Sequence, residues 1–544
     1  MSLNFFIFQK NTIVGDLENN FIDIKKSYLD SVDKNCDFFL TPELCLSGYP
    51  PKDLLFREDF IEKIDIHYKK IVNLTLNKKT SIVLSTPKIK NNYIYNTLSI
   101  IENGETKKEF EKSILPNYGV FDEKRYFKES LISDSYLEFK KYKIKFFICE
   151  DLWSDTFSKQ IIKNKYDLLI IINASPYEKN KFEKRLAITK KRVETFKAPL
   201  IYVNLVGGQD DLIFDGGSFC MDINKNITFQ APFFKDYKNN FILKKTKKIQ
   251  KIKKRDKYKD LYTALVLALR DYVRKTGFSS IILGVSGGID SALSAVIACD
   301  AVGQSRVKGF FLPSNFTSGE SKDDSTNLAK KLGINLDSIS IETLRKKYDE
   351  VLSDQFKDFS RDVTEENIQS RIRGNLLMSL SNKFNCLLLT TGNKSELSVG
   401  YSTIYGDMCG GFSILKDIYK TEVFKLCQWR NKNLSDISLL KKLELIPQNI
   451  IVKEPTAELR ENQKDSDSLL SYDILDKILY LLIDENMSLK KIEKKGFNKT
   501  DIKNLWKMIT SSEYKRFQSS LGPKVSGMNF DNDRRFPIVN KFQI

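Results

Sequence analysis

Short apolar runs alternate with amphipathic stretches along the first 240 residues. The segment 14–30 has the apolar spacing typical of an amphipathic helix. The runs that predict buried strands are 3–8, 37–43, 81–87, 95–101, 144–151, 167–175 and 199–205. Because runs this apolar suit strands that are covered on both faces, this half of the chain predicts a layered α/β domain.

A second α/β pattern begins near residue 260. The apolar spacing predicts helices over 260–276 and 291–302. Apolar runs that predict strands follow at 280–285, 308–313 and 386–392. No internal repeat relates this pattern to the first. We therefore predict two α/β domains in tandem, 1–243 and 260–544, joined by a linker over 244–259.

Positive charge is concentrated in this predicted linker. The 544 residues include 88 Lys+Arg and 70 Asp+Glu, a net charge of +18, and the stretch KKTKKIQKIKKRDKYK over 244–259 alone supplies +9. A basic protein suggests nucleic-acid binding, since Lys/Arg clusters neutralise phosphates, but here one segment carries half of the excess and the rest of the chain is only mildly basic. We interpret it as a solvated linker and expect no nucleic-acid partner.

The composition limits the cellular compartments and the kinds of active site that can be expected. No apolar run reaches the ~18 residues of a membrane span, the first residues lack the features of a signal peptide, and the eight cysteines form no CxxC pair. We expect a cytoplasmic protein with no membrane association. The single histidine argues against His-dependent triads and His-rich zinc sites. We expect His67, in the amphipathic stretch 60–70, to be a solvated surface residue.

Three residues at the ends of predicted strands make a nucleophilic set without histidine. Glu43, Lys112 and Cys149 each lie where an apolar run meets a polar turn. A thiol needs a base to become the attacking thiolate, a carboxylate can accept that proton, and an ammonium can stabilise an oxyanion. Such a set would open an amide through a thioester. The cysteines expected to be buried and structural are Cys45, Cys220, Cys299 and Cys386.

In order, context and spacing, these three residues resemble the Glu-Lys-Cys triad of the nitrilase superfamily, over about residues 1–240. The resemblance implies an N-terminal α-β-β-α sandwich in which Glu43 is the general base, Lys112 the oxyanion stabiliser and Cys149 the nucleophile, with the backbone amide of Glu150 completing the oxyanion site. Glu123 matches an additional acidic residue near such triads, or is a surface acid. The positions implied to bind glutamine are Tyr118, Ser175 and Lys181.

Residues 286–291 read Ser-Gly-Gly-Ile-Asp-Ser between a predicted strand and a predicted helix. Glycines let backbone amides approach phosphate oxygens, the hydroxyls of Ser286 and Ser291 can donate to them, and a helix N-terminus favours anions. The chain contains no GxxxxGK[ST] motif, so the loop predicts a pyrophosphate site rather than γ-phosphoryl transfer.

The hexapeptide resembles the pyrophosphate loop of the AMP-forming ATP pyrophosphatases, which implies a Rossmann-like parallel sheet and adenylate chemistry. The segments 366–382, 387–424, 455–476 and 513–526 are similar to those of NAD synthetases. Because an amidase followed by such a synthetase is the order in glutamine-dependent NAD synthetases, the chain resembles that family. The resemblance implies glutamine, ATP and deamido-NAD as substrates, Mg²⁺ as cofactor, a homo-oligomer, and a closed passage for ammonia between the domains.

Site residues of the second domain follow from the same resemblance. Asp290 and Glu396 would hold Mg²⁺, for which carboxylate oxygens are suitable ligands. The charge of Arg371 and Arg373 suits dinucleotide phosphates. The residues implied to bind ATP are Gly284, Val285, Ser286, Gly287, Gly288, Ile289, Asp290, Ser291 and Thr391. Those implied to bind deamido-NAD are Asn367, Glu396, Asp407 and Lys515. Ile404 stands where ammonia-only relatives have a Lys, so substrate contacts cannot be transferred from that branch, and Phe517 stands where a polar or basic residue is expected.

Two alternatives stay open at this point. Another glutamine-fed AMP-forming ligase, or a tRNA-modifying ATP pyrophosphatase, would carry the same two motifs. A basic RNA-binding protein on a degenerate nitrilase-like scaffold is a non-enzymatic alternative. The intact Glu43, Lys112, Cys149 and the loop 286–291 argue against degeneracy.

Overall fold

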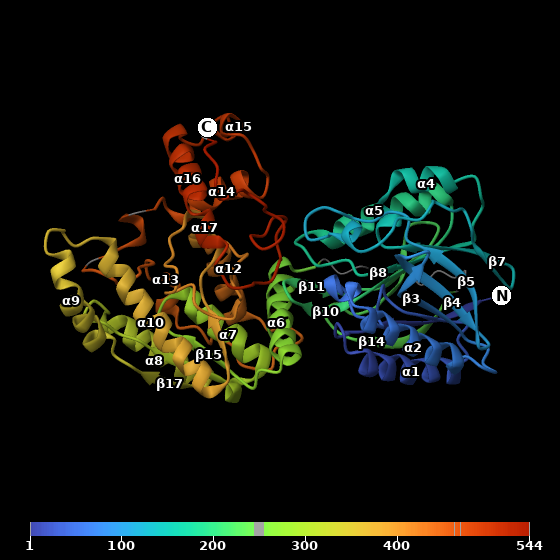
Figure 1. Ribbon diagram of the computed structural model, residues 1–544, viewed down its shortest axis with the longest axis horizontal. Helices are drawn as coiled ribbons and strands as arrows, with labels where there is room; N and C mark the ends of the chain where they lie inside the picture. The colour runs from blue at the N-terminus through green and yellow to red at the C-terminus, as the bar shows by residue number, and fades with distance from the viewer. Residues whose placement is uncertain (1, 244–254, 462, 468, 543–544) are drawn as a thin grey trace. The chain divides into compact units, whose positions relative to one another are not determined.

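The computed structural model describes residues 2–243, 255–461, 463–467 and 469–542 (Figure 1). The chain divides into two compact units, Met1–Lys254 and Arg255–Ile544. Residues 244–254 of the predicted linker lie outside the described residues. The end of that predicted linker is helical, since α6 spans Lys257–Thr276. The cause is local: the Asp256 side chain accepts hydrogen bonds from the amides of Tyr258 and Lys259 and so caps the helix.

The first unit contains two six-stranded sheets and a two-stranded hairpin. The first sheet has the order β14 (Tyr237–Leu243), β1 (Leu3–Gln9), β2 (Phe38–Leu40), β3 (Ser81–Lys90), β4 (Tyr93–Glu102), β5 (Glu105–Glu111). The second has the order β13 (Ile227–Gln230), β12 (Phe219–Met221), β9 (Leu200–Asn204), β8 (Leu168–Asn173), β7 (Tyr142–Ile148), β6 (Leu137–Phe139). The hairpin pairs β10 (Val206–Gln209) with β11 (Leu212–Asp215).

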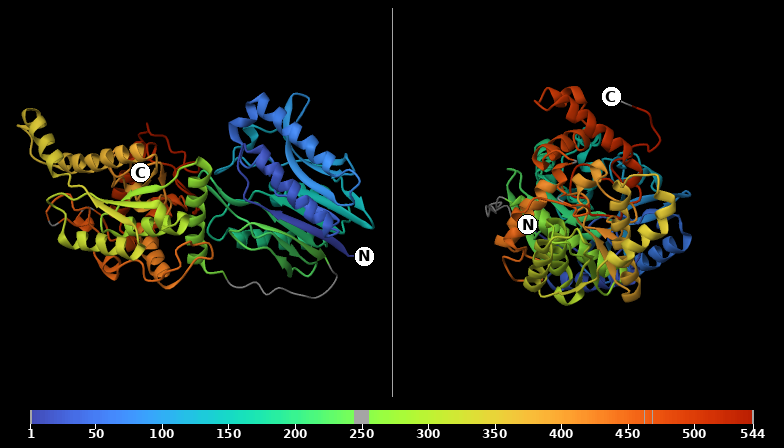
Figure 2. Two further views of the ribbon diagram at one scale, coloured as in Figure 1. Left: turned by 90° about the horizontal axis from the view of Figure 1, so that it is seen from below. Right: turned by 90° about the vertical axis from the view of Figure 1, so that its left-hand side faces the viewer.

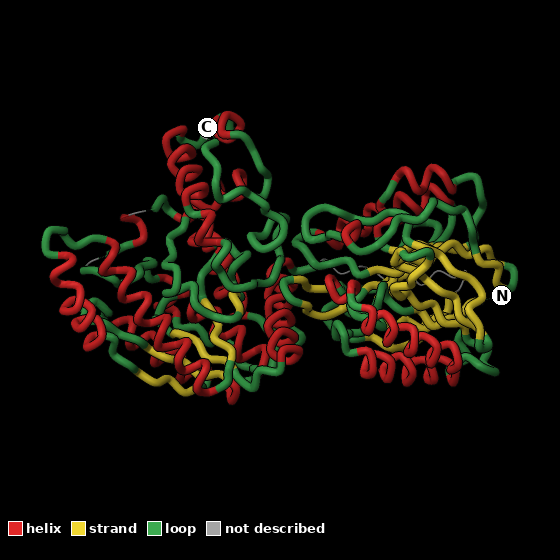
Figure 3. Tube along the Cα trace, viewed as in Figure 1, coloured by secondary structure: helices red, strands yellow, loops and turns green. Residues whose placement is uncertain are grey.

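Both faces of each sheet are covered, which is why the strands are apolar on both sides. On β1, Phe5 and Ile7 pack between the sheets, whereas Phe6 and Phe8 pack in the cluster with the helices α1 (Leu17–Asp33) and α2 (Glu58–Leu74). The helices α4 (Asp155–Ile161) and α5 (Lys181–Phe196) pack on the second sheet. The layers are thus helices, sheet, sheet, helices (Figure 3), which confirms the predicted α-β-β-α sandwich.

The prediction for the single histidine is wrong. His67 is only 8% exposed, because α2 packs against α1. Its Nδ1 lies 2.7 Å from the carbonyl oxygen of Lys63, its Nε2 lies 3.0 Å from Glu18 Oε2, and its ring meets the ring of Phe21 edge-on. The histidine therefore links two helices. The structural cysteines are buried as predicted: Cys45, Cys220, Cys299 and Cys386.

The second unit is built on a five-stranded parallel sheet, as predicted. Its order is β17 (Asn335–Ser338), β16 (Val307–Phe311), β15 (Ile281–Gly284), β18 (Leu387–Thr390), β19 (Phe412–Ser413). The chain moves from β15 to β16 and β17 on one side and then returns to pair β18 on the other side of β15. In such sheets, ligands bind at the carboxyl ends of the strands where the order reverses. That point is the end of β15.

Helices surround this sheet (Figure 2). α10 (Val363–Phe384) packs on β15, β16 and β18, and α7 (Ile289–Val302), which follows β15, packs against α6 and α12 (Lys420–Lys432). The other helices around the sheet are α8 (Gly319–Leu332), α9 (Glu342–Phe356), α11 (Lys394–Val399) and α13 (Gln448–Val452).

The C-terminal helices form a cluster of their own, which also includes Val399 of α11. They are α14 (Tyr472–Ile483), α15 (Leu489–Glu493) and α16 (Lys499–Ser511), and the short helix α17 (Glu513–Arg516) contacts α16. Within the described part of the chain, none of the helices has the length and apolar character that crossing a bilayer requires.

Candidate active sites

Glu43 and Lys112 meet in the interior of the first unit. Lys112 Nζ donates to Glu43 Oε1 at 2.8 Å, and both side chains have no exposed surface. Asn96 Nδ2 donates to the same oxygen at 2.8 Å, and the amide of Ala174 donates to Oε2 at 3.1 Å. The carboxylate is therefore fixed by three donors from three segments, as a positioned base requires.

Glu123 belongs to the same buried cluster, which settles the alternative left open by the sequence. Its Oε2 lies 2.7 Å from Lys112 Nζ, and the Tyr49 hydroxyl donates to its Oε1 at 2.8 Å. Burial raises the pKa of Glu123 to about 7, against the opposing effect of Lys112. Burial disfavours the ammonium of Lys112, but Glu123 and Glu43 outweigh it and hold the pKa of Lys112 well above its usual value. Lys112 stays charged.

Cys149 lies on a strained turn directly after β7 and before α3 (Glu150–Trp153). Its φ of 44° is in the left-handed region, which a non-glycine residue adopts only where the surrounding structure enforces it. The enforcing contact is a hydrogen bond of 2.9 Å from its amide to the carbonyl oxygen of Ile172 in β8. Burial raises the pKa of the thiol well above its usual value, and Glu43 acts in the same direction. The resting thiol is protonated and needs a base.

Asp151 is a functional candidate that the sequence analysis missed. Its Oδ1 accepts hydrogen bonds from the amides of Ser113 and Ile114 at 3.1 and 2.9 Å, and its Oδ2 accepts one from Ile148 at 3.2 Å. This carboxyl group therefore joins the segment after Lys112 to the turn of Cys149. Burial raises its pKa to about 7. A signal was available, because a buried acid three residues after the end of a buried strand is unusual unless its oxygens accept hydrogen bonds.

The three predicted glutamine-binding residues are held by different partners. The Tyr118 side chain is mostly exposed, and its hydroxyl donates to Glu150 Oε2 at 3.0 Å. Ser175 is buried, and its Oγ accepts from Arg185 Nε at 3.1 Å. The Lys181 ammonium lies 5.2 Å from the centre of the Trp153 ring. A thiolate at Cys149 would raise the pKa of both Tyr118 and Lys181, so these two residues lie within electrostatic reach of the sulfur.

In the second unit, a cavity of about 320 Å³ opens at the carboxyl end of β15. Of the nine residues predicted to bind ATP, Gly287 alone is not in its wall. Gly287 has φ +82°, and a Cβ there would lie 2.5 Å from the carbonyl oxygen of Ser321. Only glycine fits. The predicted residues in the wall are Gly284, Val285, Ser286, Gly288, Ile289, Asp290, Ser291 and Thr391, together with Glu396 and Asp407.

Asp290 and Glu396, the predicted metal ligands, face one another across a lysine. Lys420 Nζ pairs with Asp290 and lies 3.2 Å from Glu396 Oε1. Burial raises the pKa of Glu396 to about 7 and is opposed by Lys420. The sequence analysis missed Lys420, because one lysine among 88 basic residues carries no signal of its own.

The two carboxylates offer the hard oxygen donors that Mg²⁺ prefers, and they fit that ion in chemical type. Among the residues that the structure describes, no group of three or more His, Cys, Asp or Glu side chains is arranged to hold a metal. Oxygens of a bound phosphate would therefore have to complete a coordination shell around Asp290 and Glu396.

The structure brings the other predicted dinucleotide residues together through Thr403. Its hydroxyl donates to Asn367 Oδ1 at 2.7 Å, and its amide donates to Asp407 Oδ1 at 2.6 Å. Burial raises the pKa of Asp407 to about 6. Lys515 Nζ donates to the carbonyl oxygens of Gly400 and Ser402 at 2.8 and 2.7 Å, so it caps the end of α11. Asp407 lines the cavity, and Asn367 and Lys515 stand behind its wall.

Comparison with known proteins identifies both units. The Carbon-nitrogen hydrolase family model matches residues 7–237, and the NAD synthase model matches residues 261–519. The glutamine-dependent NAD(+) synthetase of Acinetobacter baylyi is 40% identical over 97% of this chain and 96% of its own length. The Aquifex aeolicus enzyme is 38% identical over 99% and 100%. The chain belongs to the glutamine-dependent NAD(+) synthetases.

Solved structures of glutamine-dependent NAD(+) synthetases agree with this assignment. The Acinetobacter baumannii enzyme, in complex with adenosine diphosphate, has a TM-score of 0.79 and 36% identity, with 99% of each chain covered. The Cytophaga hutchinsonii enzyme, at 21% identity and a TM-score of 0.83 over 99% of this chain and 98% of its own, matches in fold. The activity is glutamine-hydrolysing NAD synthesis by a carbon–nitrogen ligase, and the family implies ATP as a co-substrate. The predicted family, fold and activity are confirmed.

Proposed function

We propose that Cys149 is the nucleophile that releases ammonia from glutamine. Glu43 accepts the thiol proton, and the sulfur attacks the side-chain amide carbon while Lys112 and the amide of Glu150 stabilise the oxyanion. Ammonia leaves with the proton held by Glu43, and water then cleaves the glutamyl thioester to glutamate with Glu43 again as base. The observation that carries this proposal is the solvent-free Glu43–Lys112 pair beside a buried cysteine on a strained turn.

Substrate glutamine would be held by Tyr118, Ser175 and Lys181. The Lys181 ammonium suits a free α-carboxylate, and burial lowers its pKa, so a bound carboxylate would supply the counter-charge it needs. Tyr118 and Ser175 offer hydroxyl groups to the amino and carboxylate ends of the ligand.

The second site would then activate and amidate deamido-NAD. Its nicotinate carboxylate attacks the α-phosphate of ATP, pyrophosphate leaves, and ammonia displaces AMP to form the carboxamide. The activation is necessary because a carboxylate is a poor electrophile towards an amine. Backbone amides of the loop 284–291 and Thr391 would hold ATP, and positive charge for the leaving pyrophosphate would come from Lys420. Asn367, Glu396, Asp407 and Lys515 would position deamido-NAD.

Asp290 and Glu396 would hold the Mg²⁺ that accompanies ATP. Bound there, the ion would neutralise charge on the phosphate oxygens. Lys420 pairs with both carboxylates and so keeps them together at the wall of the cavity.

We extend the proposal to the organisation of the whole protein. The amidase domain spans 1–243 and the synthetase domain begins with α6 at Lys257, so the predicted linker 244–259 is shortened to 244–256. The enzyme acts in the cytoplasm on small-molecule substrates, without nucleic-acid partners. It acts as a homo-oligomer, since two cooperating active sites favour assembly.

A single assay tests the proposed reaction at both sites. The purified protein is incubated with deamido-NAD, Mg-ATP and either glutamine or ammonium, and NAD, AMP, pyrophosphate and glutamate are quantified. Equal amounts of all four with glutamine, and of the first three with ammonium, support the proposal. Absence of NAD with either nitrogen donor, from folded protein that binds ATP, contradicts it.

A further inference from the structure

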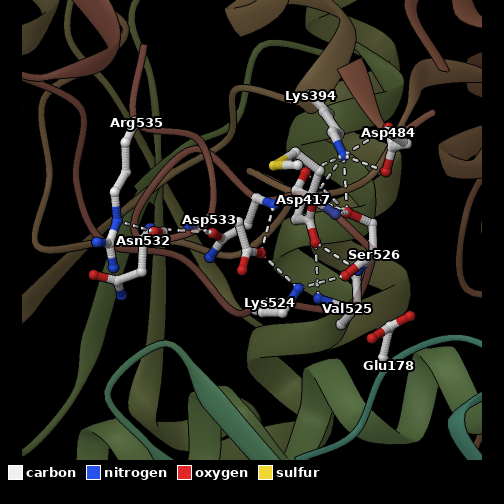
Figure 4. A network of polar contacts seen from close by, with 12 residues as sticks. Glu178, Lys394, Asp417, Asp484, Lys524, Val525, Ser526, Asn532, Asp533 and Arg535 are labelled. Atoms are coloured by element: carbon white, nitrogen blue, oxygen red, sulfur yellow. Dashed lines mark hydrogen bonds and ion pairs between the residues drawn. The ribbon is translucent and has the colours of Figure 1, made fainter. Parts of the chain in front are cut away.

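The first turn of α11 has two functional sides. On one side, the N-cap residue Asn393 donates from Nδ2 to Asp290 Oδ1 at 2.9 Å, and Glu396 lines the cavity beside Lys420. Lys394 lies between these two residues in sequence and has no exposed side-chain surface. Its ammonium enters a separate polar cluster (Figure 4).

Lys394 joins three segments of the second unit. Its Nζ lies 3.1 Å from Asp484 Oδ1, at the end of α14, and 2.9 Å from Asp417 Oδ1, ahead of α12. It also donates at 2.8 Å to Ser526 Oγ and at 2.8 Å to the carbonyl oxygen of Met528. The ammonium group of Lys394 therefore has acceptors for all its hydrogens within the protein. Two of these four partners, Ser526 and Met528, belong to the C-terminal segment.

The C-terminal segment 524–533 is folded around buried charges. Asp417 Oδ2 accepts from the amides of Val525 and Ser526 at 2.8 and 2.6 Å. Lys524, 5% exposed, donates to Asp533 Oδ2 at 2.6 Å and to the carbonyl oxygen of Ser526 at 2.8 Å. Figure 4 shows Asp417, Ser526 and Asp484 around the end of the Lys394 side chain, with Lys524 and Asp533 farther from it.

A contribution to the stability of the fold does not by itself explain why these buried residues are charged. Apolar residues of similar size often replace a buried ion pair with no loss of stability. α11 has six residues, too few for its direction to be fixed by helix propensity, so an external anchor must orient it. The cluster is such an anchor, and its directional hydrogen bonds specify one orientation of the turn.

We propose that the segment 524–533 is part of the synthetase site, because through Lys394 it fixes the first turn of α11 and so the positions of Asn393 and Glu396. Lys394 and Asp417 are positioning residues in this account. The inference rests on the roles proposed for Asp290 and Glu396. Release of the anchor would turn Glu396 away from Asp290 and Lys420, and a displacement of about 1 Å can cost about a hundredfold in rate.

The test is ammonium-supported NAD synthesis at varied ATP, measured together with thermal unfolding. We expect Lys394→Met to lower kcat by about tenfold or more while the protein stays folded, and Lys394→Arg to recover part of that loss. Arg430→Met is the matched control, because Arg430 and Asp300 form another fully buried ion pair in this unit away from the cavity. It should lower Tm with kcat unchanged.

Two further variants keep the proposal falsifiable. Ser526→Ala removes only the hydroxyl that donates to Asp417 and accepts from Lys394, and should lower kcat about twofold to threefold even if Lys394→Met fails to fold. Unchanged kcat and ATP KM in folded Lys394→Met would overturn the inference, and so would unchanged values in Ser526→Ala if Lys394→Met does not fold. Full activity of Glu396→Gln would instead overturn the role proposed for Glu396. An impaired Glu396→Gln beside a fully active Lys394→Met would remove this inference alone.

Discussion

The two active sites share one electrostatic arrangement and differ in the space beside it. In the first, Lys112 lies between Glu43 and Glu123, and in the second, Lys420 lies between Asp290 and Glu396. In each pair of carboxyl groups, burial raises the pKa of one to about 7. In the proposed mechanisms, a buried lysine shared by two acids would serve both amide hydrolysis and phosphate chemistry.

What separates the sites is how far each is assembled before substrate arrives. The Glu43–Lys112 pair has no exposed surface and needs only a small amide beside a fixed thiol. The Lys420 cluster faces a cavity of about 320 Å³. Residues of the loop 284–291, the proposed phosphate site, form part of the cavity wall. Covalent catalysis is faster when the catalytic side chains are already fixed in a buried arrangement. Adenylation of a dinucleotide instead needs a cavity large enough for two large anions.

The largest effect should come from removing the nucleophile. Cys149→Ala should abolish glutamine-supported NAD synthesis, by at least about 10³-fold, and leave ammonium-supported synthesis within about twofold. NAD formation with each nitrogen donor is the measurement. Equal loss with both donors would show that the two sites do not work separately.

The complementary substitution removes the shared lysine of the second site. Lys420→Met should lower NAD synthesis about 10²-fold with glutamine and ammonium alike, because it removes the positive charge between Asp290 and Glu396. Release of glutamate from glutamine reports the first site in the same preparation and should persist. Retention of full NAD synthesis would exclude Lys420 from phosphate binding.

A substitution of Arg185 should affect the first site and not the second, because Arg185 holds Ser175 of the first site. It pairs with Asp215, both 1% exposed, and donates to Ser175. Arg185→Met should lower the free energy of unfolding of the first unit by about 3–5 kcal/mol and raise the KM for glutamine, since a buried charge loses its partner. Lys184→Met, which removes an exposed pair with Glu178, is the control and should cost less than about 1 kcal/mol. Similar unfolding curves for the two variants would contradict this.

The shifted pKa of Glu123 predicts a pH effect confined to the first unit. Its folded-state pKa of about 7 lies above the usual 4.5, so between these values the folded chain keeps a proton that the unfolded chain releases. The contribution of Glu123 to stability is complete below about pH 4.5 and declines as pH rises to about 7. Chemical unfolding across this range should show less decline for Glu123→Gln. Parallel curves for the two proteins would mean that Glu123 does not titrate there.

The smallest effect concerns the single histidine. His67→Gln should cost about 1 kcal/mol of stability through the weakened link between α1 and α2, and should leave both activities unchanged. Urea unfolding and the two NAD assays provide the measurement. Loss of glutaminase activity would assign His67 a role that its position on α2 does not suggest.

Local patterns in the sequence were sufficient for the α/β class and for the strands that are buried on both faces, and they led to the proposed reacting residues. The apolar runs that became β1, β3, β7, β8 and β9 are buried on both faces, so their composition reports their surroundings directly. Cys149 and the loop 286–291 lie within a few residues of such strands, and their chemistry depends on local turns. Their roles could therefore be predicted from short segments.

The partners of those residues were decided only by the tertiary structure. Glu123 joins Lys112, Asp151 joins the segments of Lys112 and Cys149, and Lys420 meets Asp290 from 130 positions away. His67 is buried because α2 packs against α1, where it contacts Glu18, 49 positions away, and Lys394 bonds with Ser526 at a separation of 132. A charged residue that is neutralised by a distant segment has the same local sequence as a solvated one, because the energy of its pairing resides in a contact that folding creates.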